Sequence, residues 1–323
     1  MLSWKGPIVT DIFLTEHQLE TALDWRPLVE ELRDWFARNA VVAPPRQVLP
    51  IRQPDGSEAS LLIMPAWIPG ESIGVKIVTF FPENPQRGLA TINAGYMLFD
   101  GETGQMKSVM DGDALTARRT AAASALAADY LARKDARTLL VVGTGQLSRA
   151  MAAAHSSVRN HDRIMVWGRN CDSSARIAGA MREDGLPAEA VTDLEQACRS
   201  ADVITTVTAA TSPIIHGDWL RPGTHLDLVG AFREDMREAD DTALGQSRVF
   251  VDSVDGAMKS GDLAQPTRAG LFDPIQIEAD LAELAQGRHP GRGSDAEFTL
   301  FKSAGVAIED LAAAELAHRQ VTS

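Results

Sequence analysis

Cysteine is nearly absent from this chain of 323 residues, which contains only Cys171 and Cys198. Two cysteines cannot form the disulfide framework of a small secreted protein, so we expect the reducing environment of the cytoplasm. No apolar run reaches the ~18 residues that a membrane-spanning helix requires. Residues 1–15 also lack the basic region and the long apolar stretch of a secretion signal. We therefore expect no membrane partner.

Basic residues are also fewer than acidic residues. The chain has 31 basic and 44 acidic residues, a net charge of −13, and a pI near 5.0. This charge argues against nucleic acid as a partner. The content of 45% hydrophobic and 23% charged residues excludes a disordered, collagen-like or coiled-coil protein. At ~150 residues per domain the length corresponds to about two domains.

The N-terminal third changes from helical to strand patterning. Thr15 and Gln18 fit a helix-capping box, and Pro27 suits the first turn of a second helix. Four apolar residues of that second helix share one face and are expected in the core: Leu28, Leu32, Trp35 and Phe36. Strands are then predicted over residues 47–53, 57–64, 74–81 and 90–99, with turns at 54–56 and 100–104. Strands in direct succession predict an antiparallel or mixed sheet.

From residue 113 onward the pattern predicts alternating helices and strands. An alanine-rich stretch without glycine or proline predicts a long helix over 113–134. Short apolar strands follow at 138–142, 163–167, 203–207, 225–229 and 249–251. This alternation predicts an α/β fold with a doubly wound parallel sheet. A helix is predicted at 274–286, and a last strand and helix, 298–301 and 306–317, follow a Gly/Pro-rich loop and are expected to return to the first domain.

A glycine turn marks a dinucleotide site. The strand 138–142 runs directly into Gly143-Thr144-Gly145-Gln146-Leu147-Ser148, followed by a helical pattern. The first glycine permits a tight turn, and the second lets the backbone approach a pyrophosphate, which the helix N-terminus attracts. The small Ser148 stands at the third glycine position and still permits close packing of helix on strand. The context of strand, turn and helix predicts a Rossmann-type domain.

The end of the next strand indicates which nicotinamide cofactor is used. An NAD site usually has Asp or Glu there to bind the ribose hydroxyls. This chain has Trp167-Gly168-Arg169, with no acid at the strand tip. A guanidinium pairs well with a 2′-phosphate. We therefore predict NADPH as the preferred cofactor, with NADH possible.

Several cations stand at unusual places in the N-terminal domain. Lys76 lies in an otherwise apolar strand, where an unpaired charge is costly to bury. Arg46 follows two prolines, and Arg118 and Arg119 lie on the alanine-rich helix. Each alone is typical of a surface charge, but together they predict a site for a small anion. Neighbouring cations would lower the pKa of Lys76 and suit it to proton transfer.

Five stretches resemble one family. These are GVKIVTFFPENPQRGLAT, DGDALTARRTAAASALAA, the GTG turn, GTHLDLVGAF and FKSAGVAIEDLA, which together are similar to the ornithine cyclodeaminase/mu-crystallin family over nearly the whole chain. The resemblance implies a mixed α+β domain for substrate binding and homodimer formation, residues 1–120 plus 296–323. It also implies an inserted Rossmann domain, residues 121–295.

The resemblance further implies the residues of the site. Lys76, Arg46 and Arg119 would be catalytic. The residues implied to bind the substrate are Arg46, Met64, Lys76, Arg119 and Phe232. Those implied to hold the cofactor are Thr91, Arg119, Gly143, Thr144, Gly145, Gln146, Leu147, Arg169, Thr208, Val229 and Ser303. No metal is expected. Ser303 either contacts the cofactor or caps the last helix, Asp227 bonds either backbone or cofactor, and Asp310 is interpreted as structural.

One position separates the branches of this family. Ornithine cyclodeaminases have an aspartate where this chain has Phe232, and a phenyl ring cannot pair with a substrate ammonium group. Residues 225–241 are instead similar to reductases of Δ1-pyrroline-2-carboxylate and Δ1-piperideine-2-carboxylate, cyclic imino acids whose reduction gives L-proline and L-pipecolate. The alternatives are an ornithine cyclodeaminase, which recycles NAD, and a non-enzymatic binding protein of the mu-crystallin type.

Overall fold

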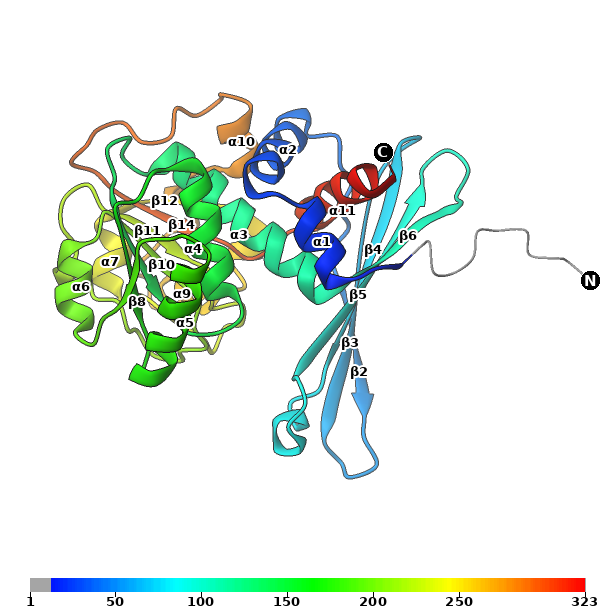
Figure 1. The fold of residues 1–323 in the computed structure, drawn as a ribbon, viewed down its shortest axis with the longest axis horizontal. Helices are drawn as coiled ribbons and strands as arrows, with labels where there is room; N and C mark the ends of the chain where they lie inside the picture. Colours follow the sequence, from blue (N-terminus) through cyan, green and yellow to red (C-terminus); the bar gives the residue numbers. More distant parts are fainter. Residues whose placement is uncertain (1–12, 323) are drawn as a thin grey trace, which may run out of the picture. The chain divides into compact units, whose positions relative to one another are not determined.

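A computed structural model describes residues 13–322 of the chain (Figure 1). Most of the stretch considered above for a secretion signal, residues 1–12, therefore lies outside the described part. Two compact units are present. The first comprises Met1–Glu31, Asn39–Arg119 and Ala307–Ser323, and the second comprises Leu32–Arg38 and Thr120–Val306. Across residues 13–322, the helices are too short or too polar to cross a membrane.

The first unit is built on a six-stranded mixed sheet. Its strands are β1 (Phe13–Leu14), β2 (Gln47–Arg52), β3 (Glu58–Ile68), β4 (Ser72–Phe80), β5 (Ile92–Asp100) and β6 (Met106–Asp111). Their order is β1-β6-β5-β4-β3-β2, and all neighbours are antiparallel except β1 with β6. The predicted strands and the turns at 54–56 and 100–104 are confirmed. The two-residue strand β1 carries no sequence signal of its own.

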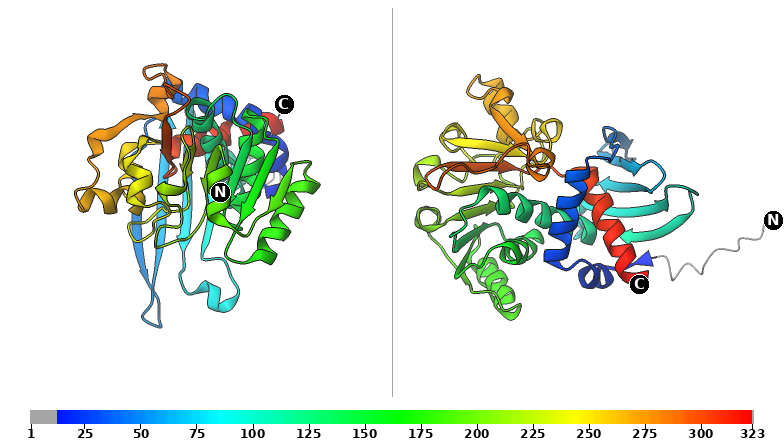
Figure 2. Two further views of the ribbon diagram at one scale, coloured as in Figure 1. Left: turned by 90° about the vertical axis from the view of Figure 1, so that its left-hand side faces the viewer. Right: turned by 90° about the horizontal axis from the view of Figure 1, so that it is seen from above.

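Helices of the first unit pack on one face of this sheet. The capping box predicted at Thr15 and Gln18 begins α1 (Glu16–Ala22). α1 lies beside the C-terminal helix α11 (Ala307–Thr322), as Figure 2 shows. α11 packs on β3 to β6, and its Glu315 accepts hydrogen bonds from Ser72 at 2.6 Å and Lys107 at 2.9 Å. The last helix is thus anchored to the sheet by polar as well as apolar contacts.

Two helices contribute residues to both units. α2 (Trp25–Arg38) buries the four apolar residues predicted for its core face. α3 (Gly112–Leu131) is the predicted alanine-rich helix, and its residues up to Arg119 belong to the first unit. A 3-10 turn, η2 (Asn84–Arg87), joins β4 to β5.

The second unit is a doubly wound parallel sheet, as predicted. Its eight strands are β7 (Thr138–Val142), β8 (Arg163–Trp167), β9 (Ala188–Ala190), β10 (Val203–Thr206), β11 (His225–Leu228), β12 (Ser247–Val251), β13 (Ile277–Asp280) and β14 (Phe298–Lys302). They lie in the order β13-β12-β14-β11-β10-β7-β8-β9, all parallel. From β7 the strands are added first on one side, as β8 and β9, and then on the other side, beginning with β10. The position between β7 and β10 is the reversal point of the sheet, and ligands of such folds bind there.

Helices cover both faces of this parallel sheet. They are α4 (Leu147–Val158), α5 (Cys171–Glu183), α6 (Leu194–Ser200), α7 (Asp241–Gly245), α8 (Val254–Ala257), α9 (Gly261–Arg268) and α10 (Leu281–Ala285), with 3-10 turns η3 (Gly217–Trp219) and η4 (Pro274–Gln276). Alternate residues of β7 enter two separate cores. Leu139 and Val141 pack with α4 and α5, whereas Leu140 and Val142 pack with α6 and α7. This alternation explains why the strand reads as continuously apolar.

The structure corrects two predictions near the C-terminus. Residues 274–286 are not one helix but η4, β13 and α10, because the side chains of Asp273 and Asp280 each cap a new turn. The family resemblance places β14 in the first domain, which it begins again at residue 296, but the strand pairs with β11 and β12 and buries Leu300 and Phe301. The return to the first unit therefore comes at Ala307.

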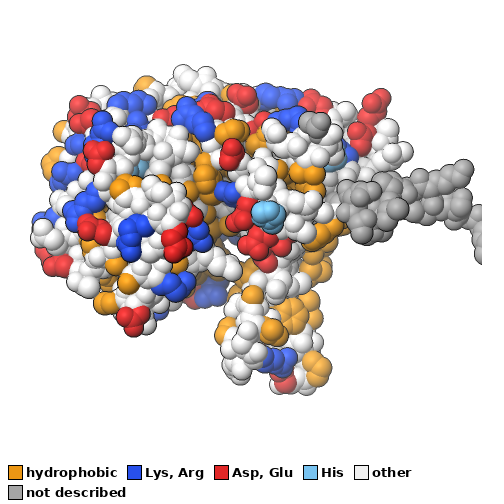
Figure 3. Space-filling model, in the orientation of Figure 1, with side chains coloured by type: hydrophobic (Ala, Val, Ile, Leu, Met, Phe, Trp, Pro, Cys, Tyr) orange, Lys and Arg blue, Asp and Glu red, His pale blue; other side chains and the backbone are white. Residues whose placement is uncertain are grey.

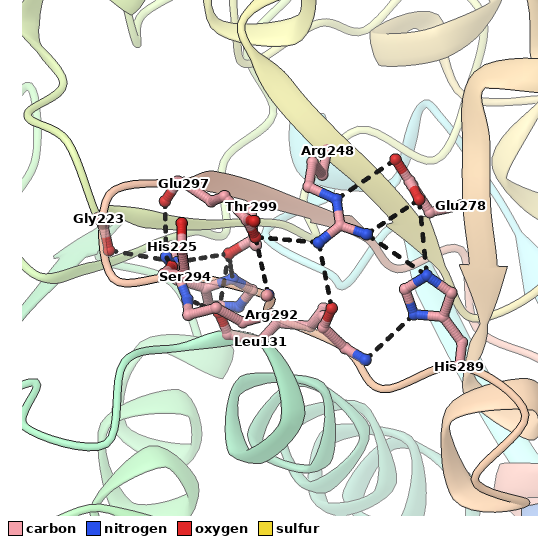
Figure 4. A network of polar contacts seen from close by, with 12 residues as sticks. Leu131, Gly223, His225, Arg248, Glu278, His289, Arg292, Ser294, Glu297 and Thr299 are labelled. Atoms are coloured by element: carbon pink, nitrogen blue, oxygen red, sulfur yellow. Dashed lines mark hydrogen bonds and ion pairs between the residues drawn. The ribbon is translucent and has the colours of Figure 1, made fainter.

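The Gly/Pro-rich loop before β14 is held by two arginines (Figure 4). Arg292 donates to the carbonyl of Leu131 at 2.6 Å and to the hydroxyl of Thr299 at 2.9 Å. Arg248 pairs with Glu297 at 2.9 Å and with Glu278 at 3.0 Å. This network ties the C-terminal end of α3 to the start of β14, at the amino edge of the sheet.

Candidate active site

Lys76 lies on the buried face of the mixed sheet. β4 buries alternate residues, Ser72, Gly74 and Lys76, and α11 packs on that side. Lys76 is only 3% exposed. Met64 of β3 and Tyr96 of β5 lie directly opposite it on the neighbouring strands. A lysine at this position must have an anionic partner.

The partner of Lys76 is Asp310, in the first turn of α11. The Lys76 ammonium lies 2.9 Å and 2.8 Å from the two carboxylate oxygens of Asp310. Arg119 donates from Nε to Asp310 at 2.9 Å and from a terminal nitrogen to Glu309 at 2.6 Å. All four side chains are buried, and their formal charges cancel. The sequence predicts only a structural role for Asp310, but Asp310 contacts two of the predicted catalytic cations, Lys76 and Arg119.

The electrostatics of this cluster lower the pKa of Lys76 toward neutral pH. Burial, and then the positive charge of Arg119, lower the pKa of Lys76 to about 8, while Asp310 acts in the opposite direction. The hydroxyl of Tyr96 has no hydrogen-bond partner among the described residues. Burial, with the carboxylates of Asp310 and Glu315, raises the pKa of Tyr96. Lys76 is thus the group in the cluster whose proton is most easily exchanged near neutral pH.

The other residues predicted in the first unit differ in their distance from Lys76. Arg46 directly precedes β2, whose first residue Gln47 pairs with Ile63, the neighbour of Met64. Arg46 thus lies just before the ladder of β2 with β3, whose Met64 pairs with Lys76 on the other side. Thr91 stands five register positions from the Lys76–Tyr96 pair, about 16 Å away at ~3.3 Å per residue.

Arg118 is structural. It donates to the carbonyl of Glu20, and its guanidinium lies 4.2 Å from the ring centroid of Trp25.

The residues predicted to hold the cofactor in the second unit gather at one edge of its sheet. Five of them follow the last residues of five strands that lie side by side in the order β8, β7, β10, β11 and β14: Arg169, Gly143, Thr208, Val229 and Ser303. Because all strands are parallel, these residues share the carboxyl edge, on both sides of the reversal point between β7 and β10. This is where dinucleotides bind in doubly wound sheets.

The glycine turn has the geometry that a pyrophosphate requires. Gly143 has φ +133°, and a Cβ there would lie 2.7 Å from the carbonyl oxygen of Val207. A Cβ on Gly145 would meet nothing within 4 Å, so the backbone is open at that point. Ser148 is buried, and its hydroxyl donates to the Gly143 carbonyl at 2.9 Å. Gln146 precedes α4 without capping it through its side chain, and the Ser148 amide donates to the Gly145 carbonyl at 3.2 Å. The positive end of the helix dipole at this turn favours an anion.

At the tip of β8, a side chain in place of Gly168 would have to displace that of Thr144. A Cβ at Gly168 would lie 2.6 Å from the Cγ2 methyl of Thr144 and 3.2 Å from the Ser174 hydroxyl. Arg169 is exposed beside this tip, and Asn170 caps α5. The arrangement leaves a cation at the position where NAD sites usually have a carboxylate.

Three remaining predictions concern single residues of the second unit. Phe232 is 43% exposed in the loop after β11, with the Arg233 guanidinium 5.9 Å from its ring centroid. Ser303 does not cap the last helix, because α11 begins at Ala307. Among the described residues, the buried carboxylate of Asp227 contacts the side chains of Ser124, Thr205 and His155 and not a backbone group. Its contact with the cofactor stays a prediction.

Sequence reasoning assigned no role in the site to several buried acids. Glu309 and Asp310 were visible as two carboxylates in an otherwise apolar helix, next to a strand lysine that required a partner. Glu238 had no such signal, because it lies in a stretch rich in exposed charges. Burial and the neighbouring Asp262 carboxylate raise the pKa of Glu238, which the structure places at the carboxyl edge of the parallel sheet.

Comparison with known proteins yields matches over nearly the whole chain. The sequence model of the ornithine cyclodeaminase/mu-crystallin family matches residues 9–323. A Δ1-pyrroline-2-carboxylate reductase of Paracoccus denitrificans is 35% identical over 309 residues, covering 93% of this chain and 93% of that protein.

Two solved structures share the entire fold. Thermococcus litoralis Δ1-pyrroline-2-carboxylate reductase in complex with NADH and L-proline has a TM-score of 0.89 and 33% identity, covering 96% of this chain and 97% of that one. An archaeal alanine dehydrogenase dimer with bound NAD has a TM-score of 0.88 and 27% identity, covering 96% of both chains.

Proposed function

This chain belongs to the ornithine cyclodeaminase/mu-crystallin family, and from that premise we propose that it is an NAD(P)H-dependent oxidoreductase that reduces the C=N bond of a cyclic 2-carboxy imine. The observation that carries the proposal is Lys76, a buried lysine with a pKa of about 8 beside Arg119. The relative that binds NADH and L-proline supports it, since L-proline is the product expected from Δ1-pyrroline-2-carboxylate. The six-membered Δ1-piperideine-2-carboxylate is the second expected substrate.

The first unit supplies the substrate contacts. Lys76, Arg119, Glu309 and Asp310 are neutral as a set, and Arg46 adds one positive charge that matches a substrate carboxylate. Arg46 and Arg119 bind that carboxylate and orient the ring, which is a positioning effect. Lys76 delivers the proton to the imine nitrogen, and Asp310 holds the Lys76 ammonium in place. Reduction adds one hydride to carbon and one proton to nitrogen, so the charge is balanced.

The second unit supplies the cofactor contacts. A reduced nicotinamide cofactor provides the hydride when it is bound. The open backbone at Gly145 and the N-terminus of α4 fit its pyrophosphate. Thr208, Val229 and Ser303 lie on the β10, β11 and β14 side of the reversal point, where the nicotinamide half belongs.

NADPH is the preferred cofactor in this proposal, with NADH as the weaker one. We expect Arg169→Ala to weaken NADPH binding about tenfold, the loss of one charge-assisted phosphate contact, and to leave NADH binding within about twofold. Fluorescence titration of both cofactors measures this. Arg163→Ala is the control, because Arg163 is an exposed arginine at the amino end of the same strand. Equal losses for both cofactors, or tighter binding of NADH by the wild type, would contradict the assignment.

One assay distinguishes the reductase from its alternatives. NADPH and NADH oxidation is followed with the five-membered and six-membered cyclic imines, beside ammonia release from ornithine. We expect imine-dependent oxidation and little or no ammonia, because Phe232 offers no carboxylate to a substrate amine. Ammonia release without imine reduction would identify an ornithine cyclodeaminase. Neither activity, with cofactor binding intact, would favour a binding protein of the mu-crystallin type.

A homodimer formed through the first unit is part of the proposal. Several large apolar residues of its sheet are exposed: Val48, Leu49, Ile92 and Met106. Hydrophobic side chains are visible on the strands of this sheet in Figure 3. The archaeal relative described as a dimer supports the assignment. Light scattering should report twice the chain mass of 34.8 kDa, and Leu49→Glu should shift the protein toward monomer. A wild-type monomer would rule it out.

A further inference from the structure

Glu238 collects an unusual number of hydrogen bonds for one side chain. It is fully buried, and its two carboxylate oxygens accept five of them. The hydroxyls of Thr206 and Thr208 donate at 2.8 Å each, and the amide of Thr208 donates at 2.8 Å. The amides of Gly230 and Ala231 donate at 2.7 Å and 3.3 Å. All five partners are donors, and the ionised carboxylate is the form that can accept from all of them.

These donors come from the ends of two neighbouring strands. Thr206 ends β10 and Thr208 follows it, whereas Gly230 and Ala231 follow β11. The two loops approach so closely that a Cβ on Gly230 would lie 2.1 Å from the Thr208 carbonyl oxygen and 2.5 Å from a Glu238 oxygen. Glu238 therefore fixes the separation and orientation of the backbone at the carboxyl edge, beside the reversal point.

A buried ion pair, Asp262 with Lys302, holds the backbone of Glu238 in place. Asp262 accepts from the backbone amide of Glu238 at 2.7 Å, and its other oxygen lies 3.0 Å from the ammonium of Lys302. Both side chains of this pair are almost completely buried. Lys302 is the last residue of β14, directly before Ser303. The chain of contacts thus connects the ends of β10, β11 and β14, which lie next to one another in the sheet.

We propose that Glu238 is a positioning residue for hydride transfer: it holds the loops after β10 and β11 in the arrangement that orients the nicotinamide ring. The inference rests on the proposed function, because it places the nicotinamide at this edge. Glu238 lies beneath the loops and acts through Thr208 and Gly230 without touching the cofactor. The adenosine half of the cofactor, at β7 and β8, does not depend on it.

Glu238→Gln tests the proposal with little change in volume. The amide keeps one accepting oxygen but places an NH₂ group against backbone donors. We expect turnover to fall about 10- to 100-fold, the effect of a small misplacement of reacting groups. The affinity for 2′-phospho-ADP-ribose, which lacks the nicotinamide, should stay within about twofold of the wild type. The affinity of the variant for NADPH should fall relative to its affinity for the fragment. The isotope effect on turnover, measured with NADPH deuterated at C4, should rise.

Asp202→Asn is the matched control. Asp202 is a buried carboxylate at the amino edge of the same sheet, and it accepts from the amides of Arg137 and Thr138 and from the Arg133 and Arg221 guanidinium groups. We expect this variant to lower Tm at least as much as Glu238→Gln, with turnover within about twofold of the wild type.

Three results would overturn the positioning role. They are turnover of Glu238→Gln within twofold of the wild type, fragment affinity lost in parallel with NADPH affinity, or turnover lost equally in Asp202→Asn. The comparison of NADPH with its fragment requires no imine, so it tests Glu238 even if the wild type reduces neither imine. If the wild type reduces neither imine, the proposed substrate is rejected, and the positioning role is judged from the binding measurements.

Discussion

Lys76→Ala is expected to lower turnover of the cyclic imine about 10³-fold, within the range that a positioned general acid contributes. The variant removes both the proton donor and one cation of the carboxylate site. Affinity for NADPH should change less than about threefold, because Lys76 is not among the residues assigned to the cofactor and most of those belong to the second unit. Lys107→Ala is the control: it removes a lysine of the same sheet, paired with Glu315, outside the proposed catalytic cluster. A Lys76→Ala enzyme that keeps a tenth of the wild-type turnover would contradict the assignment.

The pH dependence gives an independent test of the same residue. With a pKa of about 8, Lys76 is protonated below that pH and loses its proton above it. Because the proposed reaction uses the protonated form, kcat/KM should fall as the pH rises through about 8. Lys76→Arg keeps the positive charge but cannot release a proton, so a low rate without this alkaline limb is expected. A wild-type profile that is flat from pH 6 to 10 would exclude Lys76 as the acid.

Asp310→Asn is expected to destabilise the protein by about 3–5 kcal/mol, because it leaves two buried cations without their shared carboxylate. Lys76 and Arg119 both contact Asp310, and both are buried. Urea unfolding measures the loss. The control is Glu315→Gln, which weakens a less buried pair with Lys107 and should cost about 1 kcal/mol. Adding Lys76→Met to Asp310→Asn should recover part of the stability, since one uncompensated charge is then removed.

The same variant should change the titration of Lys76. Asp310 raises the pKa of Lys76 against burial and Arg119, so its removal should move the alkaline limb of kcat/KM to lower pH. A variant with unchanged stability and an unchanged pH profile would show that Asp310 does not interact with Lys76 in solution.

Local signals were sufficient for much of the architecture. The capping box at Thr15, the turn at 54–56 and the glycine turn at Gly143 each depend on residues within a few positions of one another. Their backbone geometry is set by short-range sterics and hydrogen bonds, so they can be predicted from sequence. The alternation of strand and helix after residue 113 predicted the doubly wound sheet for the same reason. That sheet then brought Arg169, Gly143 and Thr208 to one edge.

Features with distant partners could not be predicted in this way. The sequence predicts helix at β13, because the four residues of this strand carry little periodicity of their own. They form a strand because they pair with β12. The strand β14 was assigned to the wrong side of the boundary because its sequence does not show which sheet it joins. Only the pairing with β11 and β12 decides that.

The sequence by itself determined the two folding patterns, the glycine turn, the missing acid at Gly168 and the presence of a lysine in an apolar strand. Tertiary structure alone decided that the lysine meets Asp310, 234 residues away in the chain, and that Glu238 joins two strand ends. The physical reason is that a buried charge constrains only the chemistry of its partner, an opposite charge or a set of donors. Which residue fulfils that requirement depends on the packing of α11 on the mixed sheet and of the loops after β10 and β11, and no local pattern encodes that packing.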